Sequence, residues 1–321
     1  MLNYTVHAME SMTEILQEGG FASYPATERA IGEIVTLLDK AVKFELPDNG
    51  AIIDREKSLE VLDPELLHLP FPVVALEYAY TDESNIPDGS IAVPKRIALC
   101  FEYESNANYL LSNAALRSHP SLAMVGGIVV IPVMFFQGMW VPASWGCVIP
   151  REDAATVLVS RVAFGHRDHP SFSRVGMTVM PVMLEACQGL IDQFGASHSE
   201  ENGLKDSLDE VLAAVTLMAA LSCSNVGLQD VPAPGKLNKK RLKSGKLPLY
   251  GYKSVVVLTQ QASVGNEDLG GHEQRVVRSH LRRGHIRRLG DNRRIWIQST
   301  IVNAGKGLLD QSYRFAKKSS P

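Results

Sequence analysis

Cysteine is scarce in this chain of 321 residues, and its spacing excludes several classes of protein. The four cysteines stand about 40 residues apart, in apolar surroundings and without a CxxC pair: Cys100, Cys147, Cys187 and Cys223. Neither a zinc site nor a dense disulfide framework fits that spacing. We therefore expect four reduced thiols in the core of a cytosolic protein.

Long apolar runs are also missing. The most apolar stretch, residues 124–139, is interrupted by glycine, proline and glutamine, and it falls short of the roughly 20 residues that a spanning helix needs. The first residues carry acidic side chains where a secretory signal would place lysines ahead of an apolar core. We expect a cytoplasmic protein without a membrane partner.

Local catalytic and nucleotide-binding motifs are absent: the chain has no GxxxxGK[ST], no GxGxxG after a strand, no GxSxG and no HExxH. Glu77 and Glu102, in similar contexts on strands expected to be adjacent, could face each other as paired carboxylates, or could both lie on a solvated sheet face. His166 and His169 flank Asp168 in a segment that predicts a loop. We expect a protein that is not an enzyme and holds no metal or cofactor.

Hydrophobic periodicity predicts an α+β fold. Apolar residues recur at intervals of three and four over residues 9–16 and again after Thr27, which predicts two amphipathic helices at the start. Five β-branched or aromatic segments bounded by turn residues follow, at 70–80, 96–105, 127–136, 140–149 and 175–180. Helices return over residues 181–194 and 204–223. Strands grouped in this way predict a central, mostly antiparallel sheet.

The chain changes character after residue 230. Residues 231–249 hold three prolines, two glycines and six basic residues, which predicts a loop or linker. Residues 250–258 and 293–302 predict two further strands. We expect an acidic α+β body over residues 1–230 and a basic C-terminal β and loop region over residues 231–321, packed on that body.

Charge divides the chain in the same place. Residues 235–321 contain nineteen Lys and Arg against five Asp and Glu, while the first 234 residues contain 13 basic and 30 acidic side chains. A basic region of this kind favours phosphate or an acidic peptide as partner. The alternative is that the two regions neutralise each other inside one fold, through an ion-pair network.

Side chains suited to RNA or phosphate contact are concentrated in this basic region. Arginine donates in a planar fork that matches phosphate, and histidine and tryptophan can stack on bases. The candidate RNA, phosphate or partner-binding residues are Lys239, Lys240, Arg241, Arg278, His280, Arg282, Arg283, His285, Arg287, Arg288 and Trp296.

Three C-terminal segments resemble a known family. The similarity lies in the segments GKLNKKRLKSGKLPLYGYKSVVVL, RSHLRRGHIRR and RRIWIQSTIV. It is to the C-terminal half of the phage and mobile-element family that contains a subtype V-A anti-CRISPR protein. Its pattern of a basic pair between two histidines, followed by a strand tryptophan, matches His280, Arg282, Arg283, Gly284, His285 and Trp296. The chain differs at Ile286, where the anti-CRISPR member has an aromatic residue, and around Asp291.

The resemblance implies a function. The anti-CRISPR inhibitor is understood to recognise the N-terminal polypeptide of the CRISPR effector nuclease as it emerges from the ribosome, and to trigger loss of the encoding message. A similar role here implies a phage-encoded regulatory binding protein in a bacterial cytoplasm. Its expected partners are a polypeptide target and, through the basic region, RNA or the ribosome.

Two other functions stay open at this point. One is a metal-dependent RNA nuclease that uses Glu77, Glu102 or the C-terminal histidines. The other is a virion or assembly component whose basic end meets nucleic acid.

Overall fold

The computed structural model describes residues 2–50, 52, 68–81, 93–104, 108–118, 126–151, 177–257, 280–282, 285–290, 293–297 and 300–302. The helices in these ranges are α1 (Tyr4–Gln17), α2 (Pro25–Lys40), α4 (Leu110–Ser118), α6 (Leu184–Phe194), α7 (Ala196–Asp206), α8 (Leu208–Leu221) and α9 (Gly235–Lys243), with a 3-10 turn η1 (Asp48–Gly50). The strands of the main sheet are β1 (Val42–Glu45), β2 (Val73–Ala79), β3 (Lys95–Glu102), β4 (Gly127–Phe136), β5 (Met139–Pro142), β6 (Trp145–Pro150), β7 (Thr178–Pro181), β8 (Val226–Val231) and β9 (Tyr252–Val257).

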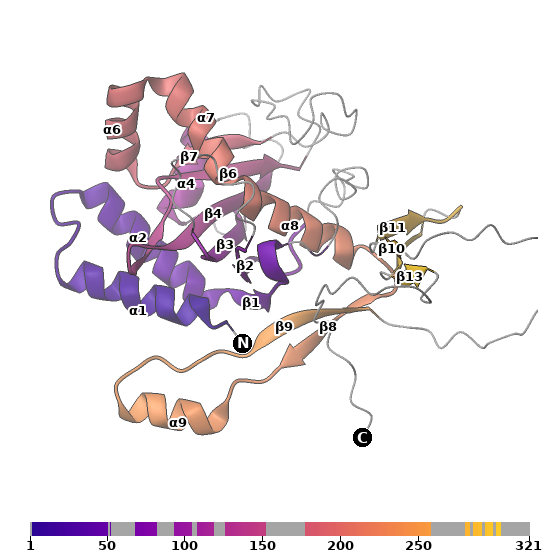
Figure 1. The fold of residues 1–321 in the computed structure, drawn as a ribbon. Helices are drawn as coiled ribbons and strands as arrows, with labels where there is room; N and C mark the ends of the chain where they lie inside the picture. Colours follow the sequence, from indigo (N-terminus) through magenta and orange to yellow (C-terminus); the bar gives the residue numbers. More distant parts are fainter. Residues whose placement is uncertain are drawn as a thin grey trace, which may run out of the picture.

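These nine strands form one sheet in the order β7-β6-β4-β3-β2-β1-β9-β8, with β5 paired beside β4 (Figure 1). Strand β1 runs parallel to both of its neighbours, and every other pair in the sheet is antiparallel. The α+β class and the mostly antiparallel sheet are thus confirmed. The domain boundary expected after residue 230 falls inside β8, which pairs with β9 across it.

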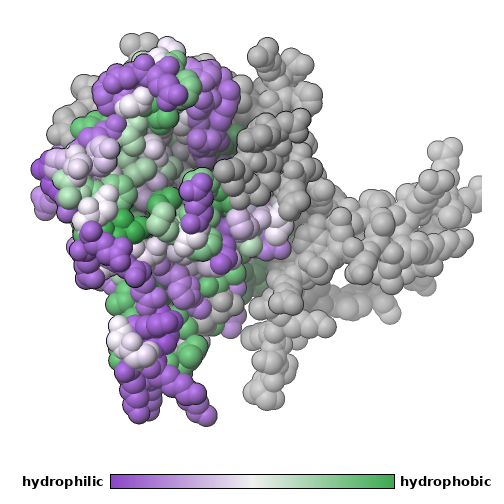
Figure 2. Space-filling model, turned by 60° about the vertical axis from the view of Figure 1, so that its left-hand side comes forward, coloured by the Kyte–Doolittle hydropathy of each residue, from purple (hydrophilic) through white to green (hydrophobic). Residues whose placement is uncertain are grey.

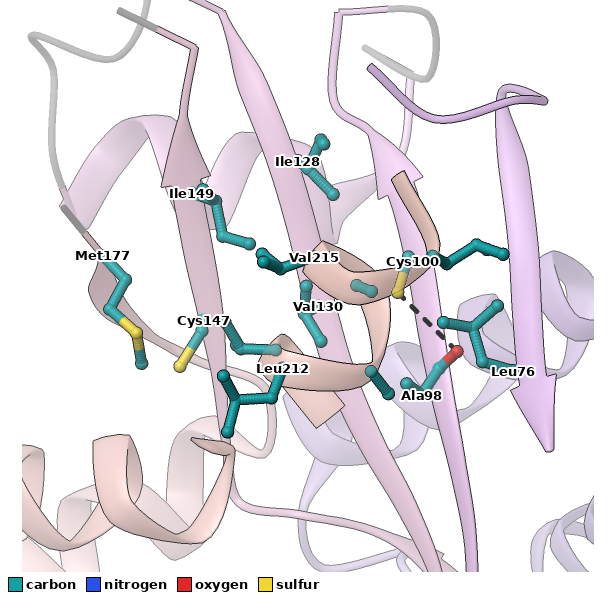
Figure 3. Packing of buried hydrophobic residues seen from close by; sticks show 14 of the residues in the cluster. Leu76, Ala98, Cys100, Ile128, Val130, Cys147, Ile149, Met177, Leu212 and Val215 are labelled. Carbon is teal, nitrogen blue, oxygen red and sulfur yellow. Dashed lines mark hydrogen bonds between the residues drawn. The ribbon is translucent and has the colours of Figure 1, made fainter. Parts of the chain in front are cut away.

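Helices cover both faces of the sheet. On β3, Ile97, Leu99 and Phe101 belong to the core that α1 and α2 complete, whereas Ala98 and Cys100 belong to the core under α8 (Figure 3). The small residues on the second face allow the alanine-rich helix α8 to approach closely. Both faces of β3 are therefore buried from Ile97 to Phe101, and a solvated surface is confined to other parts of the sheet, such as β8, where residues 228–230 are exposed.

Glu77 and Glu102, considered from the sequence as a possible facing pair, lie apart in the sheet. Glu77 pairs in register with Ile97, near the start of β3, whereas Glu102 ends that strand. Glu77 contacts the first turn of α1, on one side of the sheet. Glu102 continues the opposite face of β3 and pairs with Arg151 at 2.8 Å. The facing carboxylate pair, one of the two possibilities considered from the sequence, is ruled out because the strand register separates the two glutamates by five residues and puts them on opposite faces.

Three glutamates cap helices that are distant from them in the sequence. Each carboxylate accepts two backbone N–H groups at the start of a helix, at distances between 2.8 and 3.1 Å. Glu77 caps α1, Glu185 caps α2 and Glu33 caps α4. For α1 and α2 the N-cap residue itself makes no side-chain cap. These long-range contacts satisfy the unpaired amides and place a negative charge at the positive end of each helix dipole.

The four cysteines are free and buried, as expected. The helix expected over residues 204–223 is divided at Ser207 into α7 and α8. The strand expected over 140–149 is divided into β5 and β6. None of the helices within the described ranges combines the length and apolarity that a bilayer crossing requires.

The expectation of a loop over residues 231–249 was wrong in its centre. Residues 235–243 form α9, because the prolines and glycines of this segment stand at its ends. Pro234 precedes the first turn, and Gly245 follows the last turn with φ +71°. Lys246 N donates to Arg241 O and Gly245 N to Leu242 O, which is the pair of bonds of a Schellman helix end.

Candidate functional site

Four lysines of α9 lie along a single helical face. They occupy positions i, i+3, i+4 and i+7, which coincide on one side of an α-helix, and each is exposed: Lys236, Lys239, Lys240 and Lys243. We call this set the lysine stripe. Exposed Lys246 follows it, and no acidic residue occurs from 232 to 257. The stripe is therefore a concentrated positive surface with no acidic residue in the adjoining chain.

Helix α9 stands out from the body. It lies at the tip of the long β8–β9 connection, away from the sheet and at the edge of the molecule below α1 (Figure 1). In Figure 2 this lower tip of the molecule is mainly hydrophilic, with hydrophobic side chains at its edges. Leu237 and Leu242, 47% and 60% exposed, flank the lysine stripe on either side. The helix thus offers charge in the centre and apolar contact at both margins.

Polar side chains on the inner face fix α9 to the returning chain. The Asn238 amide donates to Leu249 O and accepts from Leu249 N, both at 2.8 Å. Arg241 Nε donates to Leu247 O at 2.7 Å. The lysines and the anchoring residues therefore divide between two faces of one short helix, and the exposed face is held in a fixed orientation.

Arg241 also joins α9 to the body. Its Nη2 lies 2.7 Å from Glu10 Oε1 on α1, and the same oxygen accepts Leu247 N at 3.0 Å. The side chain of Arg241 is only 14% exposed. Among the three α9 residues that the sequence nominated, Lys239 and Lys240 are available to a partner, whereas Arg241 is used to anchor the helix.

A second set of contacts joins the chain that leads from α9 to β9 to the end of α2. Tyr250 Oη donates to Asp39 Oδ1 at 2.7 Å, and Lys43 Nζ lies 4.0 Å from the centre of the Tyr250 ring while donating to Asp39 O at 2.8 Å. Burial lowers the pKa of Lys43 to about 8, against the opposing effect of Asp39. Lys43 is thus a buried structural cation rather than part of the exposed basic surface.

The remaining nominated residues belong to two small sheets. Strand β10 (His280–Arg282) pairs with β13 (Thr300–Val302), and β11 (His285–Arg288) pairs with β12 (Arg294–Ile297). His280 and Arg282 therefore lie on β10, and His285, Arg287 and Arg288 on β11. Arg287 is exposed. Arg278 and Arg283 lie outside the described residues, as do His166, Asp168 and His169.

Trp296, the nominated stacking residue, is buried. Only 6% of it is exposed, and it packs with Ile286 against Ala219, Ala220 and Cys223 at the end of α8. Its backbone N and O pair with the side-chain amide of Asn225 at 2.6 and 2.7 Å. Trp296 holds the β11–β12 hairpin to the body, and its ring is not accessible to a base.

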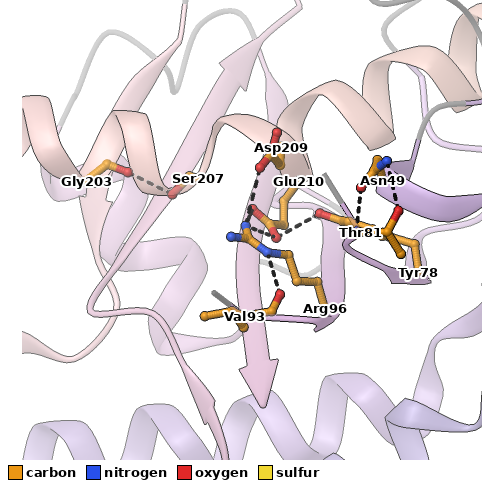
Figure 4. A network of polar contacts seen from close by, with 9 residues as sticks. All are labelled: Asn49, Tyr78, Thr81, Val93, Arg96, Gly203, Ser207, Asp209 and Glu210. Carbon is orange, nitrogen blue, oxygen red and sulfur yellow. Dashed lines mark hydrogen bonds and ion pairs between the residues drawn. The ribbon is translucent and has the colours of Figure 1, made fainter. Parts of the chain in front are cut away.

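The most elaborate polar cluster in the core is structural. Arg96 Nη1 contacts Glu210 Oε1 at 3.1 Å and Asp209 Oδ2 at 3.6 Å, and Tyr78 Oη donates to Glu210 at 2.8 Å (Figure 4). The Arg96 guanidinium also lies over the Tyr80 ring. Burial raises the pKa of Glu210, and Arg96 opposes that rise. Glu210 is completely buried, and this cluster fastens α8 to β2 and β3.

Sequence reasoning missed the geometry of the lysine stripe, although its signal was present. The i, i+3, i+4, i+7 spacing of lysines was readable, as was a glycine placed after the run, which is typical of a helix end.

Among the described residues, no group of three or more His, Cys, Asp or Glu side chains is arranged to hold a metal ion. No protein-family model matches the chain, and neither curated proteins nor solved structures give a match.

Proposed function

We propose that this protein is a regulatory binding protein that contacts RNA through the lysine stripe of α9. The observation that carries the proposal is the arrangement of Lys236, Lys239, Lys240 and Lys243 on one exposed face, without acidic neighbours in the surrounding chain. Lysine contacts phosphate as a point charge, and contacts to phosphate carry no sequence information. The expected binding is therefore sequence-tolerant and strongly salt-dependent.

The dimensions of α9 fit a polymer better than a small anion. From Lys236 to Lys243 the stripe extends over about 10 Å of helix axis, at roughly 1.5 Å per residue. The outer surface of a single helix is convex, and a nucleic-acid backbone presents several phosphates in a row along such a surface. The flanking Leu237 and Leu242 can add apolar contact to sugars or bases.

The resemblance to the anti-CRISPR family extends this proposal to a biological role. The protein binds a polypeptide target, such as an effector N-terminus emerging from the ribosome, while α9 contacts ribosomal or messenger RNA. Two weak contacts on one assembly give a combined affinity well above either alone. The outcome is lowered expression of the target in a bacterial cytoplasm.

The test measures affinity for a labelled single-stranded RNA as salt is raised. We compare the parent protein with a variant in which the four stripe lysines are replaced by glutamine. For single strands each phosphate contact contributes about −0.7 to the slope of log K against log salt, so the variant should lose a slope of about 3. A matched control is Lys205→Gln, which removes an exposed lysine on α7.

An unchanged slope in the fourfold variant, with an intact circular dichroism spectrum, would overturn the RNA role. The nuclease alternative gives a different result, because a metal-dependent nuclease cleaves the labelled RNA when divalent metal is added and a binding protein does not. Recovery of ribosomes or RNA with the tagged protein from a bacterial host, followed by loss of that recovery in the fourfold variant, would extend the result to the cell.

A further inference from the structure

A cavity lies between the β6–β7 end of the sheet and the α6–α7 hairpin, at the opposite end of the molecule from α9 (Figure 1). Its volume is about 270 Å³, and it opens to solvent. Six of its eight lining residues are apolar, and Gln188 and Glu200 add an amide and a carboxylate: Trp145, Val179, Pro181, Leu184, Cys187, Gln188, Ile191 and Glu200. Drug-sized ligands occupy pockets of about 300–1,000 Å³, so this cavity suits one or two side chains rather than a nucleotide cofactor.

One side chain of the wall is unusually open to solvent. Leu184 is 53% exposed although it lines the cavity. Trp145 contributes a buried wall, since only 7% of the residue is exposed. An apolar side chain seated against Leu184 would remove that exposed apolar surface from water.

The cavity wall is held rigidly. Helix α7 passes directly over Trp145 at Gly203, where a Cβ atom would lie only 2.7 Å from Trp145 Cγ. Cys187 Sγ donates to Ser144 O at 2.9 Å, which joins α6 to the turn before β6. Gln188 Nε2 donates to Asp192 Oδ1 at 2.8 Å, which fixes the amide at the rim. A preformed apolar cavity loses little entropy when it is occupied.

The rim carries negative charge. Glu200 is exposed and lines the cavity, and no cationic side chain of the described chain pairs with it. Asp192 and Glu201 are exposed nearby on the same hairpin, and of these Glu201 is already paired with Lys205 at 2.8 Å. The charge that complements this rim is positive, which disfavours nucleic acid as its occupant.

We propose that this cavity binds an apolar side chain of a partner polypeptide, with an adjacent Lys or Arg of that polypeptide against Glu200. The proposal deepens the function above by giving the polypeptide target a site and a chemistry, and it rests on that function only for the regulatory meaning of the contact. The two partners, RNA and polypeptide, then bind surfaces of opposite charge.

The experiment uses N-acetyl-leucyl-lysine amide as probe and follows the assigned indole N–H resonance of Trp145 by NMR. We expect a saturable shift at Trp145 and none at Trp140 or Trp296. The alanyl-lysine analogue should bind at least about tenfold more weakly, because apolar pockets discriminate missing methylenes by that order. The leucyl-glutamate analogue should bind about threefold more weakly, as expected for an exposed ion pair.

A charge exchange tests the role of Glu200. In the Glu200→Lys variant the preference should reverse, so that the leucyl-glutamate probe binds more tightly than the leucyl-lysine probe. Leu184→Ser, which alters a half-exposed residue and should leave the fold intact, should weaken both probes. The absence of a saturable Trp145 shift with the leucyl-lysine probe, or equal affinity for the leucyl and alanyl probes, would overturn the proposal.

The two proposals fail separately. Glu200→Lys and Leu184→Ser should leave the salt slope of RNA binding unchanged, because both residues lie on α6 and α7 rather than on α9. The fourfold lysine variant should retain the Trp145 shift. If RNA binding is absent while the Trp145 shift is saturable and selective, the RNA role falls and the polypeptide site stands.

Discussion

The Glu10 carboxylate on α1 binds Arg241 on α9 across 231 residues of sequence, with Nη2 and Oε1 2.7 Å apart. The same oxygen accepts the backbone N–H of Leu247. One acidic side chain thus fixes both the basic helix and the chain that leads back from it. The orientation of the lysine stripe depends on this contact as well as on the helix itself.

Replacing Glu10 with glutamine should weaken the attachment of α9 and of the chain that follows it to α1. The change removes a charge-assisted bond, and we expect a loss of about 1–2 kcal/mol in the free energy of unfolding. Hydrogen exchange at the Leu247 amide should accelerate, since that N–H loses its carboxylate acceptor. The exposed Glu14→Gln on the same helix is the control. Equal exchange rates at Leu247 in the parent protein and both variants would contradict the anchoring role.

Replacing Arg96 with methionine should destabilise the body strongly. Glu210 is fully buried and would keep Tyr78 but lose its cation. Removal of one partner from a buried ion pair costs about 3–5 kcal/mol, because the remaining charge is uncompensated. Urea unfolding measures the loss. The double variant Arg96→Met with Glu210→Gln should recover part of it, and a single variant as stable as the parent protein would rule out a structural ion pair.

Lys43 predicts a rise of stability with pH. Its pKa is about 8 in the folded protein and 10.5 as an ordinary lysine, so the unfolded chain binds more protons between these values. Stability therefore increases as pH rises through this window. Relative to Lys43→Met, the parent protein should gain about 2 kcal/mol between pH 8 and 10. Denaturation curves at several pH values measure the difference, and parallel profiles would show that Lys43 is not buried as described.

Gly203 should be intolerant of alanine. The added Cβ would meet Trp145 Cγ at 2.7 Å, and overpacking of this kind costs about 1–3 kcal/mol. The emission of Trp145 should change with it. Gly189→Ala on α6 is the matched control, because no atom lies within 4 Å of its Cβ position, and it should stabilise the helix by about 0.5–1 kcal/mol. Similar effects of both changes on the free energy of unfolding would indicate that α7 is not packed closely against Trp145.

Local pattern was sufficient for the fold class and insufficient for the site. Bulky apolar residues alternate with small or acidic ones along residues 96–105. This alternation predicts β3, because successive side chains of a strand point to opposite faces of the sheet. The loop expected over 231–249 was wrong because proline and glycine were counted over the whole segment, whereas Pro234 and Gly245 bracket α9.

The accessibility of the nominated basic residues could not be predicted in the same way. Trp296 stands among arginines in the sequence, yet its environment is set by α8, more than 70 residues earlier. Arg241 is indistinguishable from Lys240 in a basic run, and only the position of Glu10 decides which of the two is exposed. Contacts between distant segments carry this information, and periodicity does not record them.

The capping of α2 by Glu185 also bears on how the chain folds during its synthesis. The first amides of α2 donate to a carboxylate that lies 158 or 159 residues further along the chain, so they have no such acceptor until Glu185 has been synthesised. At about 5–20 residues per second, a ribosome needs roughly 8–30 s to add such a length. Through that interval the beginning of α2 has no partner from α6. Completion of the N-terminal layer is therefore tied to late translation, and a pause before residue 185 would prolong an incompletely capped intermediate.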